Sequence, residues 1–129
     1  MRTDVLVIDD EPVVRDAVRR VLEANGLSVA TAEDATTGVA HPAARDCRLV
    51  ICDLMLPDRS GEEVLRELHA SRPGLPVVLI TGFATPDHAA RAQEAGAADF
   101  LAKPFEVAEL LDVVRRVLAV GATAEERRR

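Results

Sequence analysis

Three consecutive acidic residues, Asp9, Asp10 and Glu11, directly follow the apolar run Val5–Ile8. Carboxylates held this close repel one another, so their charge must be cancelled where the end of the run is buried. A hard cation does this well, because Mg²⁺ prefers oxygen ligands and combines one or two carboxylates with water and phosphate oxygens. The alternatives are a solvated acidic loop, or a helix start that the helix dipole favours. For Glu11 the helix start is the simpler expectation.

Polar groups also follow three other short apolar runs, at residues 49–52, 77–80 and 100–102; these groups are Asp53, Thr81 and Lys103. A carboxylate can attack phosphorus as a nucleophile and form an acyl phosphate. The ammonium of Lys103 would pair with phosphate as a point charge, and the hydroxyl of Thr81 could donate a hydrogen bond to a phosphate oxygen. Each group alone is more typical of a surface, so the prediction rests on their coincidence.

The four apolar runs predict buried strands. The first three are continuous, rich in β-branched residues and short, which suits parallel strands covered on both faces. Leu27–Thr31 follows the turn pair Asn25-Gly26 and predicts an edge strand. Segments of helical period lie between the strands, at Val13–Ala24, Asp34–Ala44, Ser60–Ser71, Pro86–Ala95 and Val107–Val120. The second of these is the least regular, because Gly38 and Pro42 interrupt it.

Alternating strands and helices predict right-handed crossovers and a parallel sheet with helices on both faces. At 129 residues, the chain is expected to form one α/β domain of five strands and five helices. Ligands bind beyond the carboxyl ends of the strands in such a sheet, so the acids, the hydroxyl and the ammonium should meet at one edge. We expect the polar segment from residue 121 onward to be disordered or to begin a linker.

Composition narrows the classes of function. The chain has 22 acidic and 16 basic residues, a net charge of −6, which argues against nucleic-acid binding by this domain. No stretch approaches the roughly 18 apolar residues of a membrane span, and the N-terminus lacks a signal-peptide pattern. Cys47 and Cys52 form neither a disulfide framework nor a metal motif, so we expect reduced thiols and a cytoplasmic protein.

The motifs VLVIDDEP, ICDLMLPDRSG, VVLITGFA and DFLAKPF strongly resemble the receiver domain of two-component response regulators. The likeness covers about residues 4 to 119, with all the family's elements in the same order and spacing. It implies a flavodoxin-like (βα)5 three-layer sandwich whose five-stranded parallel sheet has the order 2-1-3-4-5. The expected division is a receiver domain over residues 1–120 and a polar tail or truncated linker over residues 121–129.

The resemblance implies a role for each polar residue of the phosphate site. Asp53 would be the phosphoacceptor, and Lys103 would bind the phosphate. Thr81 and Phe100 would form a switch pair, in which the hydroxyl moves to the phosphate and the aromatic ring turns inward behind it. The family commonly has a cis bond before the next proline, so we expect one at Lys103–Pro104.

The resemblance also implies a metal site. Mg²⁺, with Mn²⁺ as a substitute, would be bound directly by Asp10 and Asp53, by Asp9 through water and by the backbone carbonyl of Met55. The positions two residues past the acceptor and the switch threonine are Met55 and Phe83. Both are apolar, and we therefore expect slow intrinsic loss of the phosphoryl group.

The implied function is a phosphorylation-activated signalling switch and not a turnover enzyme. A sensor histidine kinase or a histidine phosphotransfer protein would donate a phosphoryl group to Asp53 in a Mg²⁺-dependent reaction. The modification would shift a two-state equilibrium and alter the face built from Pro86–Ala95, the strand at Phe100 and Val107–Val120. That face could bind an output domain or a second copy of the chain.

Three alternatives stay open from the sequence. A Mg²⁺-dependent phosphohydrolase would need a general acid two residues past its nucleophile, where this chain has Met55. A phosphorylation-independent interaction module on the same fold would have no use for the acids, Thr81 and Lys103 together. A flavin carrier would need a phosphate-binding loop and an aromatic side chain to stack on the ring, but the chain has no Trp or Tyr.

Overall fold

Strands and helices alternate across residues 2–82 and 85–127, which the computed structural model describes. The strands are β1 (Val5–Ile8), β2 (Val29–Ala32), β3 (Leu49–Asp53), β4 (Val77–Thr81) and β5 (Asp99–Ala102). The helices are α1 (Pro12–Ala24), α2 (Ala35–Ala40), α3 (Gly61–Ser71), α4 (Pro86–Ala95) and α5 (Val107–Arg127), and a 3-10 turn, η1 (Pro42–Arg45), follows α2.

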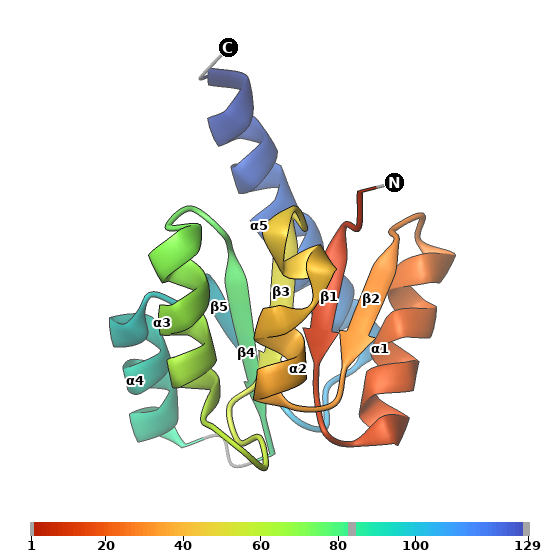
Figure 1. Ribbon diagram of the computed structural model, residues 1–129. Coiled ribbons are helices and arrows are strands. Elements are labelled where there is room, and N and C mark those ends of the chain that lie inside the picture. Colours follow the sequence, from red (N-terminus) through yellow and green to blue (C-terminus); the bar gives the residue numbers. More distant parts are fainter. Residues whose placement is uncertain (1, 83–84, 128–129) are drawn as a thin grey trace.

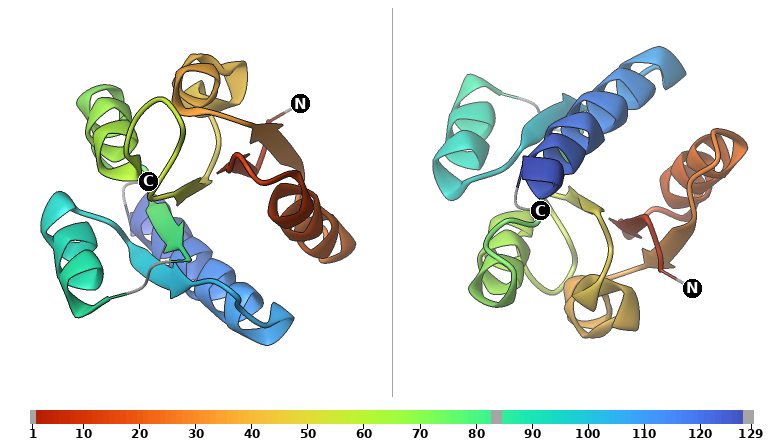
Figure 2. Two further views of the ribbon diagram at one scale, coloured as in Figure 1. Left: turned by 90° about the horizontal axis from the view of Figure 1, so that it is seen from below. Right: turned by 90° about the horizontal axis from the view of Figure 1, so that it is seen from above.

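The strands form one parallel sheet in the order β2-β1-β3-β4-β5. Helices α1 and α5 cover one face of the sheet, and α2, α3 and α4 cover the other (Figures 1 and 2). This arrangement confirms the predicted α/β class, the three-layer sandwich and the strand order that the family resemblance implied.

Burial on both faces explains why the strand sequences are continuously apolar. Along β1, Leu6 and Ile8 pack into the core under α2 and α3, whereas Val5 and Val7 pack into the core under α1 and α5. All four side chains are fully buried. Burying a side chain of this size contributes about 1.5–3 kcal/mol, so a polar residue inside the strand would be costly on either face.

Capping residues set the starts of the helices that follow the carboxyl ends of β3 and β4. Ser60 Oγ accepts a hydrogen bond from the N–H of Glu63 at 3.2 Å, and Thr85 Oγ1 accepts one from the N–H of His88 at 3.2 Å. Each bond satisfies a backbone donor that the first helical turn leaves free. Helix α4 ends at Gly96, whose φ of +97° favours glycine.

One predicted helix divides in the structure. Asp34–Ala44 splits into α2 and η1, with His41 between them at φ −63° and ψ 135°. Pro42 is the physical reason, because the proline ring disfavours the helical conformation for the residue before it. The sequence had already marked this segment as irregular.

Helix α5 is longer than predicted. It continues past Val120 to Arg127, so residues 121–127 are helical rather than a coil. Its last turns project beyond the sheet, at the end of the molecule opposite the carboxyl ends of the strands (Figure 1). Neither α5 nor any other helix of the described residues combines the length and apolar content needed to cross a lipid bilayer. The division of the chain at residue 120 stays a prediction.

Candidate functional site

The carboxyl ends of the central strands lie at one edge of the sheet, which faces the viewer in the left panel of Figure 2. The register of β1 against β3 places Asp9 level with Asp53, which is the last residue of β3. Thr81 ends β4 and pairs with the residue immediately before Lys103. The sheet therefore brings four polar residues together at the carboxyl ends of its strands: Asp9, Asp53, Thr81 and Lys103.

Lys103 joins three carboxylates at this edge. Its Nζ lies 2.8 Å from Asp53 Oδ2, 2.8 Å from Glu11 Oε1 and 3.0 Å from Asp9 Oδ2. Burial alone would lower the pKa of Lys103, but hydrogen bonds to Asp53 and Glu11 and the negative charge of Asp9 outweigh burial and raise it. The ammonium is therefore charged at neutral pH and partly neutralises the acids around it.

Glu11 contributes more to this site than the sequence indicated. It occupies the N-cap position of α1, but its side chain caps no backbone N–H there, and Pro12 follows as the first helical residue. Its carboxylate instead accepts a hydrogen bond from Lys103 Nζ. Three adjacent acids were visible in the sequence; which of them would reach Lys103 depended on the fold.

Asp9 has a buried carboxylate oxygen that could coordinate a cation. Its Oδ1 accepts a hydrogen bond from the N–H of Glu11 at 2.9 Å. Its Oδ2 receives no directed hydrogen bond from the described residues, although Lys103 Nζ lies within ion-pair distance. Burial raises the pKa of Asp9 more than the hydrogen bond from the N–H of Glu11 and the nearby charge of Lys103 lower it. A buried carboxylate oxygen in this state is costly unless a positive charge completes its coordination.

The four acids can supply the ligands of a hard cation. One carboxylate oxygen from each of Asp9, Asp10, Glu11 and Asp53 lies within 4.8 Å of the others. Asp9 and Asp53 are buried, whereas Asp10 and Glu11 are exposed at the rim. Because every donor is a carboxylate oxygen, the set suits Mg²⁺ better than a soft transition metal. The cluster and the unsatisfied oxygen of Asp9 together fit a divalent cation.

The carboxylate of Asp53 is fixed through both of its oxygens. Oδ1 accepts a hydrogen bond from the N–H of Met55 at 2.9 Å, and Oδ2 accepts one from Lys103 Nζ. Thr81 is buried beside them, and its carbonyl accepts a hydrogen bond from the N–H of Lys103 at 2.8 Å. The side chain of Met55 is 55% exposed, and Phe83 lies outside the described residues.

Comparison with known proteins agrees with this geometry. The model of the response regulator receiver domain matches residues 5–115. This chain belongs to the response regulator receiver domain family. Over 127 residues the receiver domain is 42% identical to the C4-dicarboxylate transport transcriptional regulatory protein DctD of Pseudomonas aeruginosa, covering 98% of this chain and 28% of that protein. Over 118 residues it is 36% identical to the transcriptional regulatory protein CusR of Escherichia coli, covering 92% of this chain and 52% of that protein.

Solved structures show the same fold. The receiver domain superposes on a response regulator receiver domain protein from Methanospirillum hungatei with a TM-score of 0.88 at 28% identity, covering 96% of this chain and 99% of that one. It superposes on the receiver domain of NtrX from Brucella abortus with a TM-score of 0.84 at 38% identity, covering 90% and 98% of the two chains. The resemblance noted in the sequence is thereby confirmed, although the chain spans only 28% and 52% of DctD and CusR.

Two further expectations concern β5 and the loop after it. The receiver domain has a cis peptide bond between Lys103 and Pro104, as the resemblance implied. Phe100 is half-buried and packs against the core on the α3 and α4 side of the sheet. With Ala89 and Ala92 it lines a groove of about 350 Å³ between α4 and β5. Its ring therefore lies in the core layer next to α4. A change in the rotamer of Phe100 would alter its packing against that helix.

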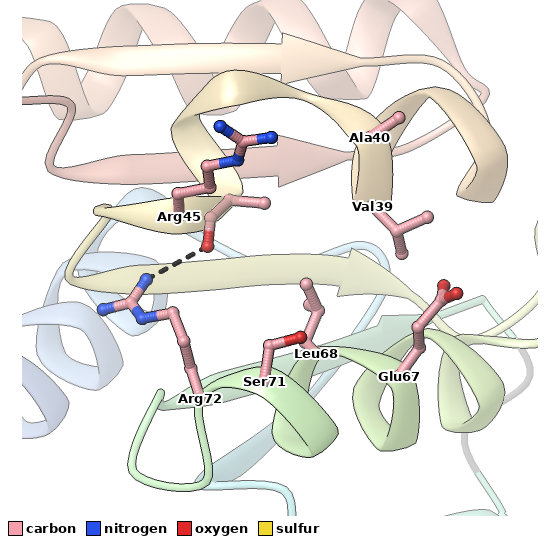
Figure 3. Close-up of a pocket in the computed structure, with 8 residues that line it drawn as sticks. Val39, Ala40, Arg45, Glu67, Leu68, Ser71 and Arg72 are labelled. Atoms are coloured by element: carbon pink, nitrogen blue, oxygen red, sulfur yellow. Dashed lines mark hydrogen bonds between the residues drawn. The ribbon is translucent and has the colours of Figure 1, made fainter.

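A larger groove of the receiver domain lies elsewhere. It measures about 500 Å³ and runs between η1 and α3 (Figure 3). Arg72 at its end donates a hydrogen bond from Nη1 to the carbonyl of Ala44 at 3.1 Å. The lining residues include none of the residues predicted for the phosphate and metal site.

Proposed function

We propose that this receiver domain is a phosphorylation-activated switch in which Asp53 accepts a phosphoryl group. The observation that supports the proposal most directly is the 2.8 Å contact between Lys103 Nζ and Asp53 Oδ2 inside a cluster of carboxylates. Phosphoryl transfer requires a nucleophile, a positive charge for the phosphoryl oxygens and ligands for a divalent cation. Asp53, Lys103 and the cluster of four acids, which lie together at one edge of the sheet, would meet these three requirements.

The proposed cation is Mg²⁺, with Mn²⁺ as a substitute. Asp10 and Asp53 would bind it directly, Asp9 through water, and Met55 through its backbone carbonyl. Bound there, the cation would supply positive charge to the phosphoryl oxygens. The unsatisfied buried Oδ2 of Asp9 supports this assignment.

The proposed donor is a phosphohistidine on a sensor histidine kinase or a histidine phosphotransfer protein. A carboxylate oxygen of Asp53 attacks phosphorus in line and forms the P–O bond of an acyl phosphate. The P–N bond breaks, and its electron pair passes to the imidazole nitrogen of the donor. Meanwhile the N–H of Met55 holds Oδ1 of Asp53, and Lys103 pairs with the phosphoryl charge. Each domain takes up one phosphoryl group, so the chain acts as a switch and not as a turnover enzyme.

The proposed response passes through Thr81 and Phe100. The hydroxyl of Thr81 would move to the phosphoryl group, and the ring of Phe100 would turn inward beside α4. This would shift the equilibrium of the α4-β5-α5 face, where Arg116 of α5 pairs with Asp99 of β5. The face would bind an output domain or form a homodimer, provided that the partner prefers one of the two states.

The proposal extends to the cellular setting of the chain. We place the protein in the cytoplasm, where histidine kinases act. Residues 1–120 would form the receiver domain and residues 121–129 a tail or linker. The net charge of −6 argues against direct nucleic-acid binding by this domain, so any DNA contact would belong to another part of the protein.

Labelling by a small phosphodonor tests the proposal. The purified domain is incubated with acetyl phosphate, with Mg²⁺ or with EDTA, and the incorporated phosphoryl group is measured by intact mass. We expect labelling of the wild type only with Mg²⁺ and none of Asp53→Asn. Asp46→Asn, at the opposite edge of the sheet before β3, is the matched control and should label like the wild type. Unchanged labelling of Asp53→Asn would remove the central assignment, whereas an unlabelled wild type would favour a phosphorylation-independent interaction module.

A further inference from the structure

The connection between β3 and α3 begins at the proposed acceptor and closes on itself. The carbonyl of Leu54 accepts a hydrogen bond from the N–H of Gly61 at 2.7 Å, and Met55 bridges Ser60 across the loop. The base of this loop is therefore a short antiparallel pair next to Asp53. Met55 lies in that base, and its N–H is bonded to Asp53 Oδ1.

The tip of the same loop is fixed to α2 by Asp58, a residue without a role in the proposed chemistry. Asp58 Oδ1 accepts a hydrogen bond from the N–H of Ala35 at 2.9 Å. Its Oδ2 accepts two more, from the N–H of Thr36 at 2.9 Å and from Thr36 Oγ1 at 2.7 Å. Seen from the carboxyl edge, the loop lies beside α2 (Figure 2, left). These bonds lower the pKa of Asp58, that of the Thr36 hydroxyl most strongly, so the carboxylate is charged at neutral pH.

Helix α2 is a firm anchor for that contact. Ala35 is fully buried in the core. Gly38 lies so close to β1 that an added Cβ would come within 2.5 Å of Ile8 Cδ1. Ile8 immediately precedes Asp9, so α2 packs against the strand that ends on the acids. Asp58 therefore joins the β3 half of the site to the β1 half through α2.

We propose that Asp58 is a positioning residue for the cation site: its clamp on α2 holds Met55 and Asp53 in register with Asp9 and Asp10. The proposal rests on the proposed function, because it concerns the affinity of the same cation site. Without the clamp, the loop would keep its base and the pairing of Arg59 with Glu67 of α3, but it would lose its link to α2 and would sample other arrangements relative to that helix. Binding a cation would then have to select one of them, which weakens affinity.

The chain contains a matched control for this clamp. Asp34 caps the same helix, because its carboxylate accepts a hydrogen bond from the N–H of Thr37 at 2.7 Å. Asp34 is half-buried whereas Asp58 is exposed, and Asp34 has no described contact with the β3–α3 loop. Replacing either acid by alanine removes one negative charge and one cap of α2. Only Asp58→Ala also releases the loop.

The experiment is isothermal titration of the whole chain with Mg²⁺, at a temperature at which every variant is folded. We expect Asp58→Ala to weaken Mg²⁺ binding about tenfold, the low end of the effect of losing an outer partner of a metal site. Asp34→Ala should bind Mg²⁺ with nearly the wild-type affinity, although both variants should lose thermal stability. Asp58→Asn keeps an acceptor oxygen without the charge, so it should recover part of the affinity if the hydrogen bonds matter.

Amide hydrogen exchange gives a second measurement that needs no cation. Because Met55 donates to Asp53 Oδ1, its amide should exchange faster in Asp58→Ala and not in Asp34→Ala. Equal Mg²⁺ affinities for the wild type and Asp58→Ala, or equal weakening in Asp34→Ala, would overturn the positioning role alone. A wild-type chain that binds no Mg²⁺ would overturn the proposed cation site, and with it the role of Asp58.

Discussion

Lys103 Nζ and Asp53 Oδ2 lie 2.8 Å apart, although fifty positions separate the two residues in the chain. Lys103 is the sole lysine among the 129 residues, and its side chain is 10% exposed. A single amine is thus placed among acids that burial and mutual repulsion would otherwise destabilise. The stability of the site therefore depends on this balance of charge and on the elements that hold these residues in place.

Removal of the Lys103 ammonium should destabilise the cation-free domain. Lys103→Met leaves Asp9, Glu11 and Asp53 without their shared partner, and we expect a loss of about 3 kcal/mol in the free energy of unfolding. Denaturant unfolding in EDTA measures it. Mg²⁺ should restore more stability to the variant than it adds to the wild type. The control is Arg66→Met, which removes an exposed cation from the surface of α3, and there the expected loss is below about 0.5 kcal/mol. Equal losses in both variants would contradict the prediction.

Mg²⁺ should stabilise the folded domain through Asp10. A ligand that binds only the folded state adds about 2.7 kcal/mol when its concentration is 100 times its dissociation constant. We expect the melting temperature of the wild type to rise with Mg²⁺ and to fall again when EDTA is added. Asp10→Asn should lose most of this response, whereas Asp16→Asn, which only breaks surface pairs with Arg19 and Arg20, should keep it. A full Mg²⁺ response in Asp10→Asn would exclude Asp10 as a ligand.

Gly61 should tolerate no side chain, because α3 begins against the backbone of the acceptor strand. An added Cβ would lie 2.6 Å from the carbonyl oxygen of Asp53 and 2.9 Å from Leu54 Cα. Neither atom can move without displacing the loop, so we expect Gly61→Ala to cost about 2–3 kcal/mol. At Gly74 an added Cβ meets nothing within 4 Å, and Gly74→Ala should be neutral or slightly stabilising. Chemical denaturation compares the two, and equal stability of the variants would refute the proposed close approach.

Asp4 should contribute a pH-dependent part of the stability. Burial by itself would raise the pKa of Asp4, but hydrogen bonds from Ser28 and the pairing with Arg48 outweigh it and hold the pKa below 3.8. Because the folded state binds this proton less tightly than the unfolded chain, the contribution is present above the unfolded pKa and is lost as pH falls. We expect Asp4→Asn to lose about 0.5–1 kcal/mol at pH 7, allowing for solvent screening. In denaturant titrations this difference should shrink below about pH 4; a difference that persists there would show that charge is not its cause.

The side chain at position 55 should influence how long the phosphoryl group lasts. Met55 is exposed beside Asp53 and presents no polar group to guide water. We expect the acyl phosphate of the wild type to outlast that of the double variant Met55→Asn with Phe83→Glu. The decay of labelled protein after removal of the phosphodonor measures both lifetimes. A wild-type lifetime no longer than that of the double variant would refute the expectation.

The sequence by itself determined the class of fold and the edge at which the site lies. Four-residue apolar runs such as Val5–Ile8 are readable because a strand buried on both faces must be apolar at every position. Asp53, Thr81 and Lys103 were found because each comes at or just after the end of such a run. The family resemblance added the strand order and the cis bond at Lys103–Pro104, which periodicity alone does not specify.

Only the tertiary structure decided which side chains meet. Glu11 reaches Lys103 across 92 positions, and Asp58 caps a helix that begins 23 positions earlier. No local pattern encodes such contacts, because they depend on strand register and on the path of two loops. The continuation of α5 through residues 121–127 was also missed, since a polar segment carries no apolar period to mark a helix. Local sequence specified the strands, the helices and the polar residues at their ends, whereas tertiary packing determined which of those side chains contact one another.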